Sequence, residues 1–140
     1  MVHEVGLAAL VSGVTAQVLK PFMDKLQKKG FNIFRMLDSG GMPSSHTSVV
    51  TTLSVGIGVY EGISSPLFAI SLVMGLYFIF EATGLRQEVG NQARVLNELV
   101  ARAREEHHLD VEQLQELIGH TWAEVLGGFA VGLLVAYLFF

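Results

Sequence analysis

Residues 122–140 form an apolar stretch that contains a single charged side chain, Glu124. A helix needs about 20 mostly apolar residues to cross a bilayer, so this stretch qualifies as a membrane span. Three shorter apolar stretches, 5–19, 47–60 and 66–80, reach that length once polar residues at their ends are included. Because 51% of the 140 residues are hydrophobic and 16% are charged, against about 25% charged in a typical soluble domain, the composition predicts an integral membrane protein.

We therefore predict an all-α fold, an integral membrane bundle of four spanning helices in one membrane domain, 1–140. The spans are expected at approximately 3–20, 44–61, 65–84 and 121–140, and the cytoplasmic connections at 20–43 and 85–120. Small residues recur four apart along the expected spans, as at Ser48, Thr52 and Gly56 or at Gly128 and Gly132. Such ridges let helices approach closely, within the bundle or in a homodimer, although membrane helices are also simply rich in glycine.

The basic residues predict the orientation of the bundle. All nine Lys and Arg lie in segments 20–35 and 86–104, so the positive-inside rule places both long connections in the cytoplasm and both termini outside a plasma or inner membrane. Apolar residues at helical spacing near 95–100 and 111–118 predict two short amphipathic cytoplasmic helices at the membrane surface. The net charge of −4 argues against a nucleic-acid partner, and the absence of Cys excludes cysteine nucleophiles and zinc fingers.

Polar side chains gather at the cytoplasmic ends of the expected spans. Helix N-termini bind anions, and nearby Lys and Arg side chains add positive charge, so a phosphate site is expected there. Two His side chains can act as nucleophile and proton donor in phosphoryl transfer, and a carboxylate one helical turn from a His can fix its tautomer. The residues concerned are Lys20, Arg35, Ser44, Ser45, His46, Arg86, His120 and Glu124.

Each of these residues also has a purely structural interpretation. Thr121 and Glu124 have the spacing of a capping box, and Ser44 lies where an ordinary helix start is expected. Lys20 and Arg35 can be topology signals alone. The residues by themselves leave both interpretations open.

Residues 39–46, Ser-Gly-Gly-Met-Pro-Ser-Ser-His, resemble the Pro-Ser-Gly-His motif of the type-2 phosphatidic acid phosphatase and vanadium haloperoxidase superfamily. More closely, they resemble its divergent branch of small membrane proteins. Further strings are similar to that branch: Ala-Gln-Val-Leu-Lys at 16–20, Glu-Ala-Thr-Gly-Leu-Arg at 81–86, Gly-Asn-Gln-Ala at 90–93, Leu-Asn at 96–97 and Leu-Ile-Gly-His-Thr at 117–121. The resemblance covers nearly the whole chain.

The resemblance implies a phosphatase or phosphotransferase that uses a phosphohistidine intermediate and needs no metal or other cofactor. It implies His120 as the nucleophile, Glu124 as the group that orients it and His46 as the general acid. It further implies a phosphate-binding set made of Ser44, the backbone at Ser45, Lys20, Arg35 and Arg86.

The chain also departs from the superfamily motifs. Ser45 replaces a Gly, Glu124 replaces an Asp, and Leu114 stands six residues before His120, where the superfamily has Arg. The first motif, Lys-x6-Arg-Pro, is matched in spacing by Lys28 and Arg35, whereas the branch strings favour Lys20 as the phosphate lysine. The superfamily usually has six spans, and this chain has four expected ones.

These observations predict a membrane lipid phosphatase that cleaves a lipid phosphate monoester or diphosphate at the cytoplasmic face. Phosphatidylglycerophosphate is the first expected substrate, phosphatidate the second and a polyprenyl diphosphate the third. The alternative is a non-catalytic lipid-phosphate-binding or transport protein that retains the anion site. A purely structural four-helix scaffold is a third reading.

Overall fold

The computed structural model describes residues 2–38, 40–107, 114 and 119–140. Within these ranges every regular element is a helix, and no strand occurs. The elements are α1 (Val2–Leu26), the 3₁₀ helix η1 (Ile33–Leu37), α2 (Ser45–Glu61), α3 (Pro66–Phe80), the π-helical turn η2 (Glu81–Leu85), α4 (Arg86–His107) and α5 (Trp122–Phe139). The predicted all-α class is thus confirmed for the part of the chain that is described.

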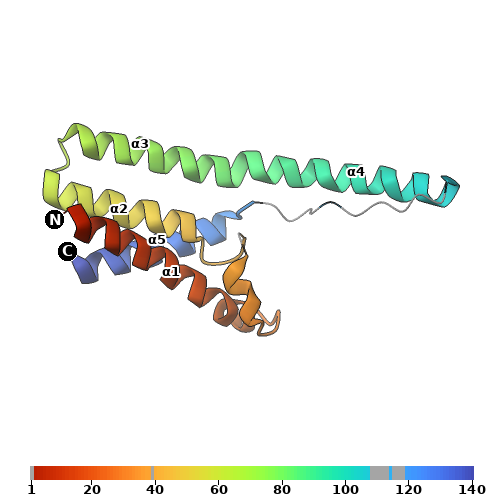
Figure 1. The fold of residues 1–140 in the computed structure, drawn as a ribbon, viewed down its shortest axis with the longest axis horizontal. Coiled ribbons are helices and arrows are strands. Elements are labelled where there is room, and N and C mark those ends of the chain that lie inside the picture. Colours follow the sequence, from red (N-terminus) through yellow and green to blue (C-terminus); the bar gives the residue numbers. More distant parts are fainter. Residues whose placement is uncertain (1, 39, 108–113, 115–118) are drawn as a thin grey trace.

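The helix α2 lies at the centre of the bundle and packs against α1, α3 and α5, while α1 also packs against α5. Figure 1 shows both chain termini at one end of the bundle and the turn between η1 and α2 at the other. Because α1 and α3 run toward this second end and α2 and α5 start from it, the polar residues at those helix ends are brought together there.

Small residues make close contacts between the helices. An added Cβ on Gly13 would lie 2.7 Å from a Val49 methyl, and one on Gly132 would lie 2.7 Å from the carbonyl oxygen of Ser48. The predicted small-residue ridge on α2 is buried. Gly62 also has a small residue four positions before it, but it does not lie in a contact between helices. It ends α2 with a φ of 85°, and the space around it is open. Helices therefore approach each other closely at particular glycines and not at every small residue spaced four apart.

Buried hydroxyl groups add hydrogen bonds between these helices. The Ser48 hydroxyl donates to the carbonyl of Ser12 on α1 at 3.0 Å. The Thr52 hydroxyl donates to the carbonyl of Gly132 on α5 at 2.9 Å. Both bonds connect α2 to another helix, so polar as well as apolar contacts hold α2 against α1 and α5.

Among the described residues, three helical segments are long and apolar enough to cross a membrane: His3–Leu26, Pro66–Ala101 and Trp122–Phe139. The chain is an integral membrane protein on this basis. The helix α2, with 17 residues, is not among the three, so the predicted fourth span is not confirmed. The division of the chain into the predicted spans and connections stays a prediction.

The helix α4 differs from the expected short surface helix. It has 22 residues and continues α3 through η2 as one long rod that extends beyond the bundle (Figure 1). At 1.5 Å per residue, the 36 residues of Pro66–Ala101 span about 54 Å, far more than the roughly 30 Å of a hydrocarbon core. The helix predicted near 111–118 lies outside the described residues, apart from Leu114.

Candidate functional site

The candidate site lies at the end of the bundle opposite the termini and begins with the cap of α2. The Ser44 hydroxyl accepts a hydrogen bond from the backbone N–H of Thr47, which makes Ser44 the N-cap. Its own backbone N–H donates to the carbonyl of Glu124 at 2.9 Å. This bond joins the start of α2 to the start of α5. His46 lies in the first turn of α2, and His120 directly precedes the N-cap of α5.

The imidazole of His120 is held by Glu124. Nδ1 of His120 lies 3.0 Å from Oε2 of Glu124, and the same carboxylate caps α5 by accepting the backbone N–H of Thr121. The capping box is therefore confirmed, and the same carboxylate contacts the imidazole of His120. The backbone N–H of His120 donates to the carbonyl of Ala82 in η2 at 2.9 Å, which fixes the position of the residue on a second side.

The two histidines face each other across the start of α2. Their ring centroids are 5.8 Å apart, with 52° between the ring planes. The His120 side chain is only 2% exposed, whereas His46 is exposed. Since a carboxylate can only accept, the contact with Glu124 fits a proton on Nδ1 of His120. The two rings differ in their surroundings: the His120 ring is enclosed and paired with a carboxylate, whereas His46 is exposed.

Two cations lie beside this pair. Lys20 is 1% exposed, and its Nζ donates to the backbone carbonyl of Asp38 at 2.6 Å. Arg35 pairs through Nε with Asp24 at 2.6 Å and through Nη1 with Asp38 at 2.5 Å. Hydrogen bonding to Asp24 raises the pKa of Arg35 above its usual value, so this side chain keeps its positive charge throughout the physiological pH range.

Gly41 lies close to both basic side chains and to Glu124. A Cβ at this position would lie 3.0 Å from Nη2 of Arg35 and 3.8 Å from Cδ of Lys20. The backbone N–H of Gly41 lies near the Glu124 carboxylate, and the φ of 100° at this residue favours glycine. The absence of a side chain therefore helps the turn before α2 to approach both basic side chains.

The structure brings together most of the predicted site residues: Lys20, Arg35, Ser44, Ser45, His46, His120 and Glu124. Lys28, the other candidate for the phosphate lysine, is exposed in the turn after α1, so the position of Lys20 agrees better with that role. Arg86 is the first residue of α4, and its side chain lies outside the described set. Leu114 is held beside α4 by two backbone hydrogen bonds with the Asn97 side chain, each 2.9 Å long.

Sequence reasoning missed three residues of the site: Asp24, Asp38 and Gly41. Asp24 follows Lys20 by four residues, a spacing that puts both on one face of a helix and was a usable signal. Asp38 follows Arg35 by three residues and caps η1, a short helix that the sequence analysis did not predict. Gly41 lies in an irregular turn, where spacing carries no such information. Within the described residues, no group of three or more His, Asp or Glu could hold a metal ion.

Comparison with known proteins assigns the chain to a family. The profile of the Divergent PAP2 family matches residues 1–135. A curated relative, "Uncharacterized membrane protein YuiD" of Bacillus subtilis (strain 168), is 34% identical over 150 aligned positions, which cover 95% of this chain and 94% of the relative. No solved structure matches the chain significantly.

Proposed function

This chain belongs to the Divergent PAP2 family, and we propose that it is a membrane lipid phosphatase, a metal-independent phosphoric ester hydrolase. One observation carries the proposal: His120, held by Glu124, faces His46 at 5.8 Å between ring centroids. Lys20 and Arg35 lie next to this pair through Gly41. A nucleophile, a proton donor and two cations are the groups that phosphoryl transfer requires.

The proposed reaction has two steps. Nε2 of His120 attacks the phosphorus while the bond from phosphorus to the lipid oxygen breaks, and His46 donates a proton to that oxygen. Water then attacks the phosphohistidine, His46 accepts the proton of the water, and the N–P bond breaks to release phosphate. Lys20, Arg35 and Arg86 neutralise the phosphate oxygens in both transition states, and the start of α2 at Ser44 and Ser45 supplies N–H groups.

The substrate is proposed from the orientation of the bundle. With the site at the cytoplasmic face, phosphatidylglycerophosphate comes first, phosphatidate second and a polyprenyl diphosphate third, because the first two are made on that side. The orientation, with both termini outside, and the homodimer remain proposals of their own.

Single cysteines test the orientation cleanly, because the natural chain contains none. Ser64→Cys lies between α2 and α3, and Glu98→Cys lies on α4; both positions are exposed. We expect an impermeant thiol reagent applied to intact cells to label the first variant and not the second. Labelling of both from outside would contradict a cytoplasmic site.

The test of the function is phosphate release by the purified protein in detergent micelles containing each candidate lipid. We expect release by the wild type and none by His120→Ala. His46→Ala should release phosphate much more slowly, because the leaving oxygen then departs without its proton donor.

The almost complete burial of the His120 ring favours one alternative, a lipid-phosphate-binding or transport protein that has lost turnover. That protein would bind vanadate or phosphate, release nothing from any lipid and keep its affinity in His120→Asn. Such a result would replace the phosphatase proposal.

A further inference from the structure

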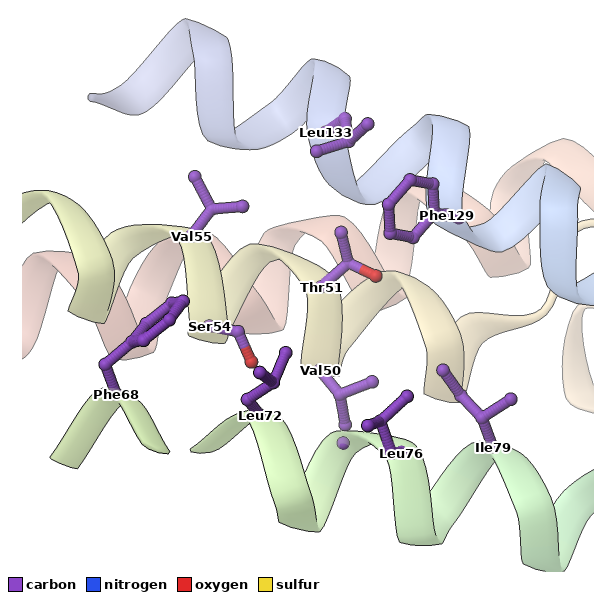
Figure 2. A pocket seen from close by; sticks show the side chains of 11 residues that line it. Val50, Thr51, Ser54, Val55, Phe68, Leu72, Leu76, Ile79, Phe129 and Leu133 are labelled. Atoms are coloured by element: carbon purple, nitrogen blue, oxygen red, sulfur yellow. The ribbon is translucent and has the colours of Figure 1, made fainter. Parts of the chain in front are cut away.

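An apolar groove runs between α2, α3 and α5, away from the polar contacts of the site. Figure 2 shows side chains from all three helices directed toward this space, which has a volume of about 250 Å³. Apart from the hydroxyls of Thr51 and Ser54, the side chains that line it are hydrocarbon. Those that the argument uses are Val50 on α2, Phe68, Leu76 and Ile79 on α3, and Phe129 on α5.

At one end of the groove, each of the three lining helices also leads to a residue of the candidate site. Val50 lies one helical turn beyond His46 on α2, and Phe129 lies about one turn beyond Glu124 on α5. On α3, the carbonyl of Ile79 accepts the Thr83 hydroxyl, next to the Ala82 carbonyl that holds the backbone of His120. The groove therefore begins about one helical turn from His46 and about one turn of α3 from Ala82, whose carbonyl holds the backbone of His120.

The length of the groove corresponds to one leaflet of a bilayer. Phe68 and Ile79 lie 11 positions apart on α3, which is about 16 Å along a helix, and half of a typical hydrocarbon core is about 15 Å. Leu76 and Phe129 are lining residues that are also exposed at the outer surface of the bundle. The groove is thus open sideways, where lipid surrounds a membrane protein.

We propose that this α2–α3–α5 groove binds one hydrocarbon chain of the phosphorylated lipid whose phosphate lies between His46 and His120. The inference rests on the proposed function and specifies its substrate as a lipid with at least one chain long enough to reach from the site toward Phe68. A hydrocarbon chain gains little by leaving other lipid chains for apolar side chains. The groove acts by orientation instead, since it holds the phosphate ester in line with Nε2 of His120.

Gly75 offers a direct way to close the groove. It lies in the middle of the α3 wall, and an added Cβ would make only ordinary contacts, 3.6 Å from Val50 and 3.8 Å from the Ser54 hydroxyl. Gly75→Ala therefore fits without displacement, and Gly75→Phe places a ring in the space that the lipid chain would occupy. Val73→Phe is the matched control, because Val73 is 65% exposed on the same helix and does not line the groove.

The experiment uses phosphatidate with a photoreactive diazirine in the middle of one acyl chain, in mixed micelles with the purified protein. We expect mass spectrometry to find the label on groove residues of α2, α3 and α5. The groove label should fall at least tenfold in Gly75→Phe, fall partly in Gly75→Ala and stay unchanged in Val73→Phe. Phosphatidylcholine with the same diazirine chain should label the groove at least tenfold less, because its headgroup is not a phosphate monoester.

Two outcomes would overturn the inference. One is a label spread evenly over the lipid-facing surface of α3 and unaffected by either Gly75 variant. The other is equal labelling by phosphatidylcholine, which would make the groove a site for bulk lipid. The proposed function fails separately: groove labelling without phosphate release from any lipid would leave the chain-binding site in place and remove the hydrolysis. Labelling in His120→Ala should match the wild type, since this variant removes the nucleophile and leaves the groove intact.

Discussion

Gly128 of α5 lies so close to Ser44 that a Cβ on the glycine would collide with the serine's carbonyl oxygen. This contact brings the capped start of α2 against the first turns of α5, where the Ser44 N–H reaches the Glu124 carbonyl. The geometry of the two histidines depends on this contact, because His46 follows Ser44 by two residues and His120 precedes Glu124 by four.

Gly128→Ala should destabilise the protein by about 1–3 kcal/mol, the usual cost of forcing an extra carbon into a packed interface. The measurement is thermal unfolding in detergent. Gly6→Ala in α1 is the matched control, because an added Cβ there meets nothing within 4 Å. The control should keep or slightly raise the unfolding temperature, and equal losses in both variants would contradict the importance of this contact.

Glu124→Gln should lower the rate of phosphate release by about 100- to 10 000-fold. A glutamine can still cap α5 through its carbonyl oxygen, but it no longer stabilises the protonated imidazole. Thr121→Ala removes the hydroxyl that caps the Glu124 N–H and should cost about 1 kcal/mol of stability with most of the activity kept. If Glu124→Gln turned over at the wild-type rate, the carboxylate would be a helix cap only.

Asp24→Asn and Asp38→Asn should have different effects, although both aspartates pair with Arg35. The Asp24 side chain is 8% exposed and that of Asp38 is 48% exposed. Loss of the buried carboxylate should cost about 1–3 kcal/mol of stability and raise the KM for the lipid phosphate, because Arg35 loses its orientation. Loss of the exposed one should change stability by less than about 1 kcal/mol. Thermal unfolding and steady-state kinetics measure both effects, and similar results for the two variants would argue against Asp24 as a positioning residue.

Ser48→Ala should cost about 0.6 kcal/mol, the average for a hydrogen bond between membrane helices, because it removes the bond from α2 to the Ser12 carbonyl. Thr15→Val is a useful comparison. Its hydroxyl bonds to the carbonyl of Val11 in its own helix, so its loss breaks no contact between helices. A larger effect of Thr15→Val on the unfolding temperature would contradict this assignment.

Phosphate release should persist after dialysis against EDTA. In the proposed reaction the nucleophile is a histidine nitrogen, and Lys20 and Arg35 supply the positive charge that a divalent cation provides in other phosphatases. Release that disappears on chelation and returns with Mg²⁺ would show that the reaction depends on a metal ion.

Local patterns in the sequence were sufficient for several features. The apolar stretches predicted an all-helical membrane protein, and the four-residue spacing of His120 and Glu124 predicted their contact. The first depends on the geometry of a single helix, which repeats every 3.6 residues whatever its surroundings, and the second on the capped start of α5, because His120 directly precedes the N-cap Thr121. The apolar spacing near 95–100 likewise predicted a helix, although a shorter one than α4. Its direction was not predictable, because η2 continues α3 into α4 without a break and nothing in the local pattern distinguishes a straight continuation from a bend.

The membrane character, the helices and the identity of the candidate chemical groups follow from the order of residues in the chain. The arrangement of the site does not. His46 lies beside His120, and Gly41 lies beside Arg35 and Lys20, only because α1, α2 and α5 pack together through small residues and the turn before α2 folds back onto them. Local hydrogen bonding and hydrophobic periodicity act over a few residues, whereas contacts between distant segments depend on which helix faces fit against each other.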